Sequence, residues 1–342
     1  MLNTLKELCV LSGPSSYEGP VRDYLKIRAE AAGAVCRVDG MGNLICEKKG
    51  AKSVPDTLML CAHMDEVGFI VRHITEDGYI KFACLGGIDR RVLIGKPVFL
   101  GKDRVPGVIG LKAIHLTTPE ERKKVPKLEE LFIDIGARSR EEAEALTHLG
   151  DFAVFSDSIT EYGHQMLKAK ALDDRIGCAV MIELMERALP MDVTFAFTVQ
   201  EEVGTRGAFG AAFSVTPKLA LVLEGTTAAD SPTTDVHRRV CYPGRGPVVP
   251  YMDGGTVYDR GLFELLRDLA EEHQIPWQTK EYISGGSDAG AIQRTKAGIR
   301  VAAVSAAVRY LHSPSSVASI RDLEHIETLA LRFIESVAAG RA

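Results

Sequence analysis

Apolar and polar positions alternate along the chain with two periods. At the amino terminus, Leu2, Leu5, Leu8 and Leu11 repeat at helical spacing. The short apolar run over 57–62 has the composition of a buried strand, and polar residues follow it directly. Together with the turn-forming residues between them, these patterns predict helices over 2–11 and 18–32, paired strands over 35–38 and 44–47, and a buried strand over 57–62.

The pattern changes after the first buried strand. From about residue 68 to residue 162, short alternating runs separated by Gly and Asp turns predict a small β-rich domain with a helical segment over 139–146. After residue 163 the chain again alternates apolar strands with amphipathic helices, which is typical of an α/β sheet covered by helices. The segments in this last part are predicted as helices over 173–188, 260–273 and 288–297, and strands over 193–199 and 219–223.

The two ends of the chain therefore share the pattern of an α/β domain, and the middle has the pattern of a β-rich domain. We predict a single α/β domain, made of residues 1–66 and 163–342, into which a β-rich domain of residues 67–162 is inserted. Such an insertion separates polar residues in the sequence that the sheet can bring together in space.

Composition excludes several classes of protein. The chain has 342 residues, 46% of them hydrophobic and 25% charged, which is ordinary for a soluble globular protein. Its net charge of -5 gives no footprint for nucleic acid. No apolar run approaches the roughly 18 residues of a membrane span, and the amino terminus lacks a signal-peptide layout, so we expect a cytoplasmic protein. Seven cysteines without C-x-x-C spacing argue against a disulfide framework and a structural zinc site; Cys61 and Cys178 lie in apolar runs and are expected in the core.

The most informative stretch is the predicted strand that begins at Val193, because it ends on two adjacent carboxylates, Glu201 and Glu202. Catalytic groups tend to gather at the carboxyl ends of such strands. Neighbouring residues that leave a strand point in different directions. One carboxylate can therefore bind a metal while the other faces a water molecule.

Four further polar clusters stand at strand ends or helix starts. Together with 200–204, they lie at 62–68, 171–177, 223–230 and 310–314. Combined, they supply two histidines and several carboxylates, which is the inventory of a two-metal hydrolase. Asp173, Glu202 and Glu224 would bring three negative charges to two divalent cations, leaving about one positive charge for a bridging hydroxide to neutralise. His63 and His312 are neutral ligands that would complete the shells.

These five motifs, in this order and with the insertion between the first and second, resemble those of the tetrahedral aminopeptidases. The resemblance covers nearly the whole chain, including 131–137 and the segment Gly285 to Ala289. It implies a zinc-peptidase-like mixed sheet flanked by helices and an inserted domain that supplies much of the subunit contact. It also implies a cytosolic, co-catalytic metallopeptidase that assembles from dimers into a hollow dodecamer.

The resemblance also implies the metal ligands. Asp173 would bridge the two metals, His63 and Glu224 would hold one, and Glu202 and His312 would hold the other. Many relatives have Asp where this chain has Glu224, so the extra methylene could alter the reach to the metal. Asp230 is a nearby competitor for that role. Zinc and cobalt are the leading candidates and manganese is a third, since carboxylate and imidazole ligands suit all of them.

Two further residues receive catalytic roles from the resemblance. Glu201 would be the general base that moves a proton from the metal-bound water to the leaving amine. Asp65 would accept a hydrogen bond from the far nitrogen of His63 and fix the orientation of that ring. Asp174, beside the bridging carboxylate, is expected to pair with Arg175 or cap a helix.

The main hypothesis is an aminopeptidase that removes residues from short peptides with a free amino terminus. A serine hydrolase is a second hypothesis, because Gly285 to Ala289 nearly matches a nucleophile elbow around Ser287. A third is a non-catalytic scaffold that binds peptides by strand addition to the β-rich domain. The same two-metal core could also hydrolyse deacetylase or glycan substrates, and a requirement for a free α-amine separates these from peptides.

Overall fold

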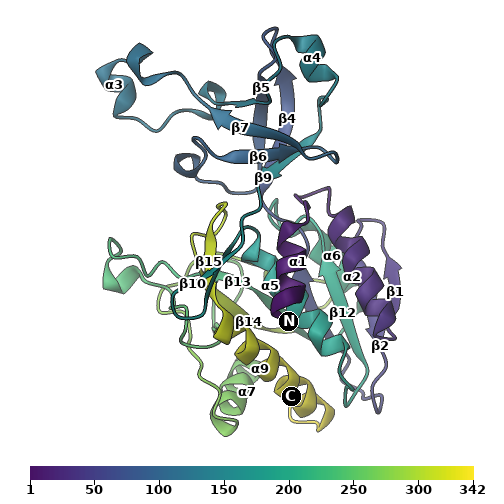
Figure 1. Ribbon diagram of the computed structural model, residues 1–342. Helices are drawn as coiled ribbons and strands as arrows, with labels where there is room; N and C mark the ends of the chain where they lie inside the picture. Colours follow the sequence, from purple (N-terminus) through teal and green to yellow (C-terminus); the bar gives the residue numbers. More distant parts are fainter.

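The computed structural model describes residues 1–342 and contains two separate sheets (Figure 1). The larger is a nine-stranded sheet whose four central neighbours, β12, β3, β13 and β14, run parallel. In spatial order its strands are β1 (Val35–Val38), β2 (Leu44–Lys48), β12 (Val193–Thr198), β3 (Leu58–His63), β13 (Leu219–Thr227), β14 (Arg300–Arg309), β15 (Ser316–Ser319), β11 (Met166–Ala169) and β10 (Thr160–Tyr162).

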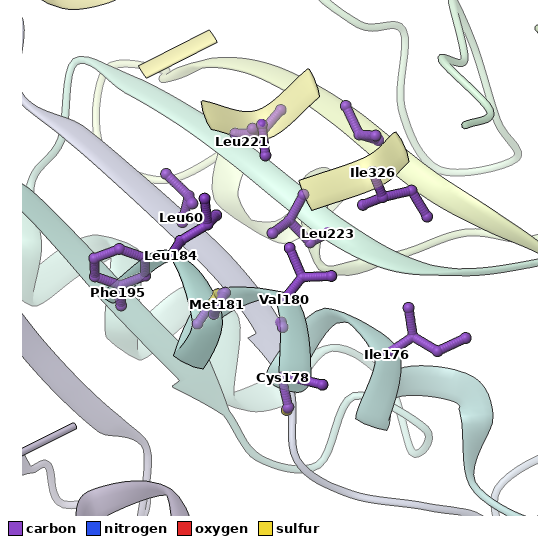
Figure 2. Close-up of a cluster of buried hydrophobic side chains, with 14 of the residues drawn as sticks. Leu60, Ile176, Cys178, Val180, Met181, Leu184, Phe195, Leu221, Leu223 and Ile326 are labelled. Atoms are coloured by element: carbon purple, nitrogen blue, oxygen red, sulfur yellow. The ribbon is translucent and has the colours of Figure 1, made fainter. Parts of the chain in front are cut away.

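Helices cover both faces of this sheet. One face packs on α1 (Leu2–Val10), α2 (Gly19–Ala31), α5 (Leu172–Met185), α7 (Arg260–Glu272) and α9 (Ile320–Ala338), and the other packs on α6 (Arg206–Val215) and α8 (Asp288–Gln293). Because both faces are covered, the central strands are continuous apolar runs: in β3, Leu58 and Leu60 enter one core while Met59 and Cys61 enter the other. Figure 2 shows the first core, where side chains of α5 lie beside those of β3, β12 and β13.

The smaller sheet is a closed antiparallel barrel with a core of its own, in which Phe69 makes edge-to-face contacts with Phe82 and Phe155. Figure 1 shows it set apart from the large sheet. Its strands are β4 (Gly68–Ile74), β5 (Ile80–Leu85), β8 (Phe132–Asp134), β7 (Val105–Gly110), β6 (Pro97–Leu100) and β9 (Phe152–Phe155). The short helices are α3 (Pro119–Arg122) and α4 (Arg140–Glu144), with 3-10 turns η1 (Arg90–Val92), η2 (Ile114–Leu116), η3 (Leu128–Glu130) and, outside the barrel segment, η4 (Val236–Arg238).

The structure confirms the predicted mixed α/β fold with a small β-rich part. It differs from the predicted segments at two points. Residues 160–162 form β10, which pairs with β11 in the large sheet, so the barrel itself covers 68–155. Helix α8 ends at Gln293, short of the predicted residue 297, and Lys296 has a φ of 54°, which a right-handed helix does not allow. The predicted segments do not include α6, β14, β15 or α9.

The topology sets up one polar edge. The chain leaves the large sheet for the barrel just after His63 and rejoins it at β10. The four parallel strands all present their carboxyl ends on the edge where the chain departs. Side chains that follow those strands can therefore converge below the barrel.

Candidate metal centre

The register of the parallel strands brings the predicted site residues to one level. Thr198, the last residue of β12, lies beside His63 at the end of β3, and Glu201 and Glu202 follow. Val222 of β13 lies beside Cys61, so Glu224 stands about level with His63. Asp173 and His312 arrive from the start of α5 and from the turn after β14.

Four of the predicted ligands cluster tightly. Ligand atoms of His63, Asp173 and Glu202 all lie within 4.8 Å of one another. The two oxygens of Asp173 face different histidines: Oδ1 is 3.3 Å from Nε2 of His63, and Oδ2 is 3.8 Å from Nε2 of His312. His312 Nε2 is also 3.2 Å from Glu202 Oε2. A carboxylate between two histidines is placed as a bridging ligand would be.

Glu201 and Glu224 are less directly engaged. Glu201 Oε2 lies 4.0 Å from Nε2 of His63, on the edge of the cluster. The side chain of Glu224 is buried and makes no hydrogen bond or ion pair, but the charges of Lys280, Asp173 and Glu201 act on the pKa of its carboxyl group. The structure thus places Glu224 beside the cluster without bringing it into contact with His63.

Both histidines are oriented in the same way. Nδ1 of His63 is 3.0 Å from the main-chain oxygen of Asp65, and Nδ1 of His312 is 2.8 Å from the main-chain oxygen of Gly87, in the barrel segment. If each Nδ1 carries the proton, each Nε2 is left as a free lone pair directed at Asp173. The predicted orienting group was the Asp65 carboxylate, but its Oδ1 lies 3.5 Å from Nδ1, so the main-chain oxygen makes the closer contact.

Burial is the largest influence on the pKa values of the three glutamates. It raises the pKa of Glu201 to about 9 and the pKa of Glu202 to about 8, and it raises the pKa of Glu224 well above its usual range. In each case a neighbouring histidine or lysine offsets only part of the penalty, and other carboxylates add to it. The chain has thus gathered more buried acid than its own cations neutralise.

The pKa values of Asp173 and the two histidines shift in the directions that favour their charged forms. Burial alone would raise the pKa of Asp173, but contacts with His312 and His63 outweigh it and hold this pKa below its usual range. Burial likewise disfavours the charged imidazoles, yet the surrounding carboxylates raise the pKa of His312 to about 9 and that of His63 well above normal. The histidines act here as partial counter-ions to the acids.

The donor set fits divalent cations. Glu202 Oε1 is buried and has no hydrogen-bond partner, although its other oxygen contacts His312. A small cavity lined by Asp173, Glu202 and His312 adjoins it, with Phe155 of the barrel on its wall. Cations among these groups would favour ionised carboxylates and neutral histidines, which opposes the raised pKa values of the three glutamates and the two histidines. Carboxylate and imidazole ligands suit zinc, cobalt and manganese alike.

Side chains hold the loop that carries Glu201 and Glu202. The main-chain N–H groups of residues 199–202 donate in turn to Asn43 Oδ1 at 3.0 Å, Glu18 Oε1 at 3.1 Å, Asp65 Oδ1 at 2.9 Å and Asp65 Oδ2 at 3.2 Å. The acceptors come from three distant segments of the chain. Buried N–H groups that leave a sheet need such partners, so these residues fix where the two glutamates point. Sequence reasoning gave Glu18 and Asn43 no role, because neither lies near the Glu-Glu pair in the chain.

A buried ion cluster supports the other side of the site. Glu66 receives hydrogen bonds from Lys170 Nζ at 2.7 and 2.8 Å, and Arg175 Nη2 lies 3.4 Å away. All three side chains are almost fully buried. Lys170 and Arg175 flank Asp173 in sequence, so Glu66 ties the segment carrying Asp173 to the end of the strand carrying His63.

The residues behind the alternative hypotheses have structural roles. Asp174 caps α5 by accepting from Gly177 N–H at 2.9 Å, and it also accepts from the His63 N–H at 3.2 Å. Asp230 pairs with Arg309, which removes it as a rival to Glu224. The Ser287 hydroxyl accepts from Ala289 N–H at the start of α8 and contacts no histidine, so it lacks the base a serine nucleophile needs. Cys61 and Cys178 are fully buried, as predicted.

Two histidines and several buried carboxylates at the ends of parallel strands are typical of metallohydrolase sites. Comparison with known proteins identifies the family. A family model described as M42 glutamyl aminopeptidase matches residues 42–329. The chain belongs to the M42 aminopeptidase family, and it is a peptide hydrolase.

Individual relatives match over almost their full length. A putative aminopeptidase from Acetivibrio thermocellus is 36% identical over 336 residues, covering 98% of both chains. The TET aminopeptidase from the marine sediment archaeon Thaumarchaeota archaeon SCGC AB-539-E09 superimposes with a TM-score of 0.94 at 34% identity, covering 100% of this chain and 98% of that one. The TET1 peptidase of Pyrococcus horikoshii, described as able to assemble into a tetrahedron or a large octahedral shell, superimposes with a TM-score of 0.86 at 34% identity, covering 97% of this chain and 98% of that one.

Among the helices of the chain described here, none combines the length and the apolar composition that a membrane span requires.

Proposed function

We propose that the protein is a dinuclear metal-dependent aminopeptidase that removes amino-terminal residues from short peptides. The observation that supports this most is the placement of Asp173, with one oxygen toward His63 and the other toward His312. Two divalent ions, zinc or cobalt first and manganese as a third candidate, would have Asp173 between them. His63 and Glu224 would hold one ion, and Glu202 and His312 the other. When bound, the ions would polarise the scissile carbonyl and lower the pKa of a water molecule.

In this proposal Glu201 is the general base. Its carboxylate makes no hydrogen bond and lies 4.0 Å from His63, its nearest ion-pair partner, so it is free to receive a proton. It would take a proton from the attacking water and deliver it to the nitrogen of the leaving amine. A general base works best when its pKa lies near the working pH. Burial raises the pKa of Glu201 and nearby cations would lower it again, which gives the protein two opposing means of setting that value.

Asp65 would support catalysis by positioning other residues. It holds the N–H groups of Glu201 and Glu202, so it aims the base and one ligand together. The substrate's ammonium group would bind against the acidic cluster, which favours peptides with a free amino terminus over blocked ones.

The assembly and its partners are part of the same proposal. By analogy with the TET1 peptidase, which can assemble into a tetrahedron or a large octahedral shell, this chain would form a homo-oligomer, with a dodecamer built from dimers as the expected state. The inserted domain, residues 67–162, would supply much of the subunit contact. A net charge of -5 is not typical of a protein that binds nucleic acid, and we propose neither a nucleic-acid nor a membrane partner. The expected location is the cytoplasm.

The test uses leucyl and glutamyl peptides, each with a free and an acetylated amine. Chelator-stripped protein should be inactive, and zinc or cobalt should restore hydrolysis of the free-amine peptides only. A Glu201→Gln variant should bind the metals but stay inactive. Hydrolysis that survives metal removal, or that is equal on acetylated peptides, would contradict the proposal. The leucyl-to-glutamyl ratio would also begin to define the preferred residue.

A further inference from the structure

Two cysteines face each other at the edge of the large sheet. Cys36 of β1 is the direct cross-strand partner of Cys46 of β2, and their Sγ atoms are 2.8 Å apart. The hairpin is closed by a hydrogen bond from Asp39 N–H to Asn43 O, and hydrogen-bonded and non-hydrogen-bonded pairs alternate from there. The Cys36–Cys46 pair therefore falls at a non-hydrogen-bonded position, where side chains of opposite strands approach most closely.

The surroundings make the two thiols unequal. Cys36 is half-buried on β1, which is the outermost strand of the sheet, whereas Cys46 is fully buried behind it. Contact with the Cys46 sulfur lowers the pKa of Cys36, so the more accessible sulfur is also the better nucleophile. None of the other cysteines has a second cysteine sulfur in contact.

We propose that Cys36 and Cys46 form a reversible disulfide by exchange with a small-molecule disulfide such as oxidised glutathione. The Cys36 thiolate attacks one sulfur of glutathione disulfide, which forms a mixed disulfide and releases one glutathione thiolate. Cys46 then attacks the Cys36 sulfur and releases the second glutathione. The two protein thiols are oxidised, the small disulfide is reduced to two thiols, and the two protons lost by the cysteines end on the glutathione sulfurs.

The bond would lie close to the catalytic loop. Strand β2 pairs with β12, which leads into Glu201 and Glu202, and the turn of the same hairpin supplies Asn43. Asn43 accepts from the Val199 N–H and donates to the Gly207 oxygen at 2.9 Å. A disulfide across the hairpin would restrain β1 and β2, and Asn43 lies in the turn that joins these two strands. This inference does not depend on the proposed metal chemistry, because it concerns only the thiols.

Peptide mapping tests the proposal directly. The intact protein is equilibrated with oxidised glutathione at about pH 8, free thiols are blocked, and the chain is digested with trypsin. Cleavage after Arg37 places Cys36 in the peptide 29–37 and Cys46 in the peptide 38–48, so the disulfide joins two peptides that otherwise separate. We expect the linked pair to be the dominant form, and dithiothreitol to return both peptides.

Two variants serve as controls. Cys84→Ser removes the other half-buried cysteine and should leave the linked peptides unchanged. Cys46→Ala removes the second nucleophile, so the glutathione adduct of Cys36 should accumulate instead. The proposal is overturned if wild-type protein leaves both thiols free for blocking, or if it stops at the Cys36 adduct as the Cys46→Ala variant does.

Discussion

Replacing Asp65 by Asn tests whether one buried carboxylate positions the catalytic loop. Oδ1 of Asp65 accepts from Glu201 N–H, and Oδ2 accepts from Glu202 N–H and from the Ser15 hydroxyl at 2.6 Å. An Asn side chain keeps only one acceptor oxygen. Whichever way its amide is turned, the NH2 group must face one main-chain N–H, and that N–H cannot reverse its role as a donor.

The expected cost follows from this geometry. Asp65 is fully buried, so the N–H group that loses its acceptor also lacks water, which costs about 1–3 kcal/mol of the free energy of unfolding. The loop would shift to relieve the clash and carry Glu202 away from His63, Asp173 and His312. Loss of a residue that supports metal ligands typically lowers metal affinity or activity by about 10–100-fold. We expect Asp65→Asn to show both effects, measured by urea denaturation of the stripped protein and by calorimetric titration with cobalt.

Ser15→Ala is the matched control. It removes one donor to the same carboxylate but leaves both main-chain N–H groups paired, so it should cost only about 1 kcal/mol and leave cobalt affinity nearly unchanged. If Asp65→Asn binds cobalt with wild-type affinity and unfolds at the wild-type urea concentration, then Asp65 does not hold the loop. The reasoning would also fail if Ser15→Ala were as damaging as Asp65→Asn.

Three further predictions concern the same site. Protons must leave Glu202 (pKa about 8) and His312 (pKa about 9) before a metal binds, so cobalt affinity should rise about tenfold or more per pH unit between pH 6 and 8. Calorimetric titrations in buffers of different ionisation enthalpy should detect the released protons. A cobalt affinity that does not change with pH would argue against these ligands. Glu66→Gln leaves Lys170 and Arg175 buried without a full counter-charge and should lower the free energy of unfolding by about 3–5 kcal/mol, whereas a glutamine at an exposed glutamate should have no measurable effect. Ser287→Ala should retain most peptidase activity, since the hydroxyl caps α8 and contacts no histidine; abolition with metals still bound would revive the serine hydrolase hypothesis.

Much of the site could be predicted from the sequence because strand ends carry its chemistry. The apolar run before Glu201 predicts a buried strand, and the run before His63 predicts another; both strands exist and lie side by side. What the sequence could not show is how the loop after β12 is held. Glu18 and Asn43 lie more than 150 residues from the N–H groups they accept from, as their sequence separations of 182 and 156 show, and no local pattern joins such positions.

The elements that the pattern did not predict have different physical reasons. β14 is rich in alanine, which is depleted in strands, and burial on both faces removes the alternation that marks a half-exposed strand. Helix α6 contains Gly207 and Gly210, which weaken any helix prediction. Gly207 must be a glycine because an added Cβ would lie 2.3 Å from Asn43 Oδ1. The predicted segments omit α9 for no such reason, because its sequence has a clear apolar face at helical spacing.

The junction with the barrel explains why an insertion so close to the site is tolerated. Glu66 stands just before the chain enters the barrel, and Lys170 stands after it has returned, so their ion pair closes the base of the insertion across 104 residues. The same closure fixes His63 and Asp173 relative to each other, independently of the barrel strands. The barrel contributes one contact that this closure cannot replace, the Gly87 oxygen that orients His312. His63 and Asp173 therefore belong to the large sheet alone, whereas His312 depends on the barrel being docked, and loosening that segment should weaken the His312 side of the site first.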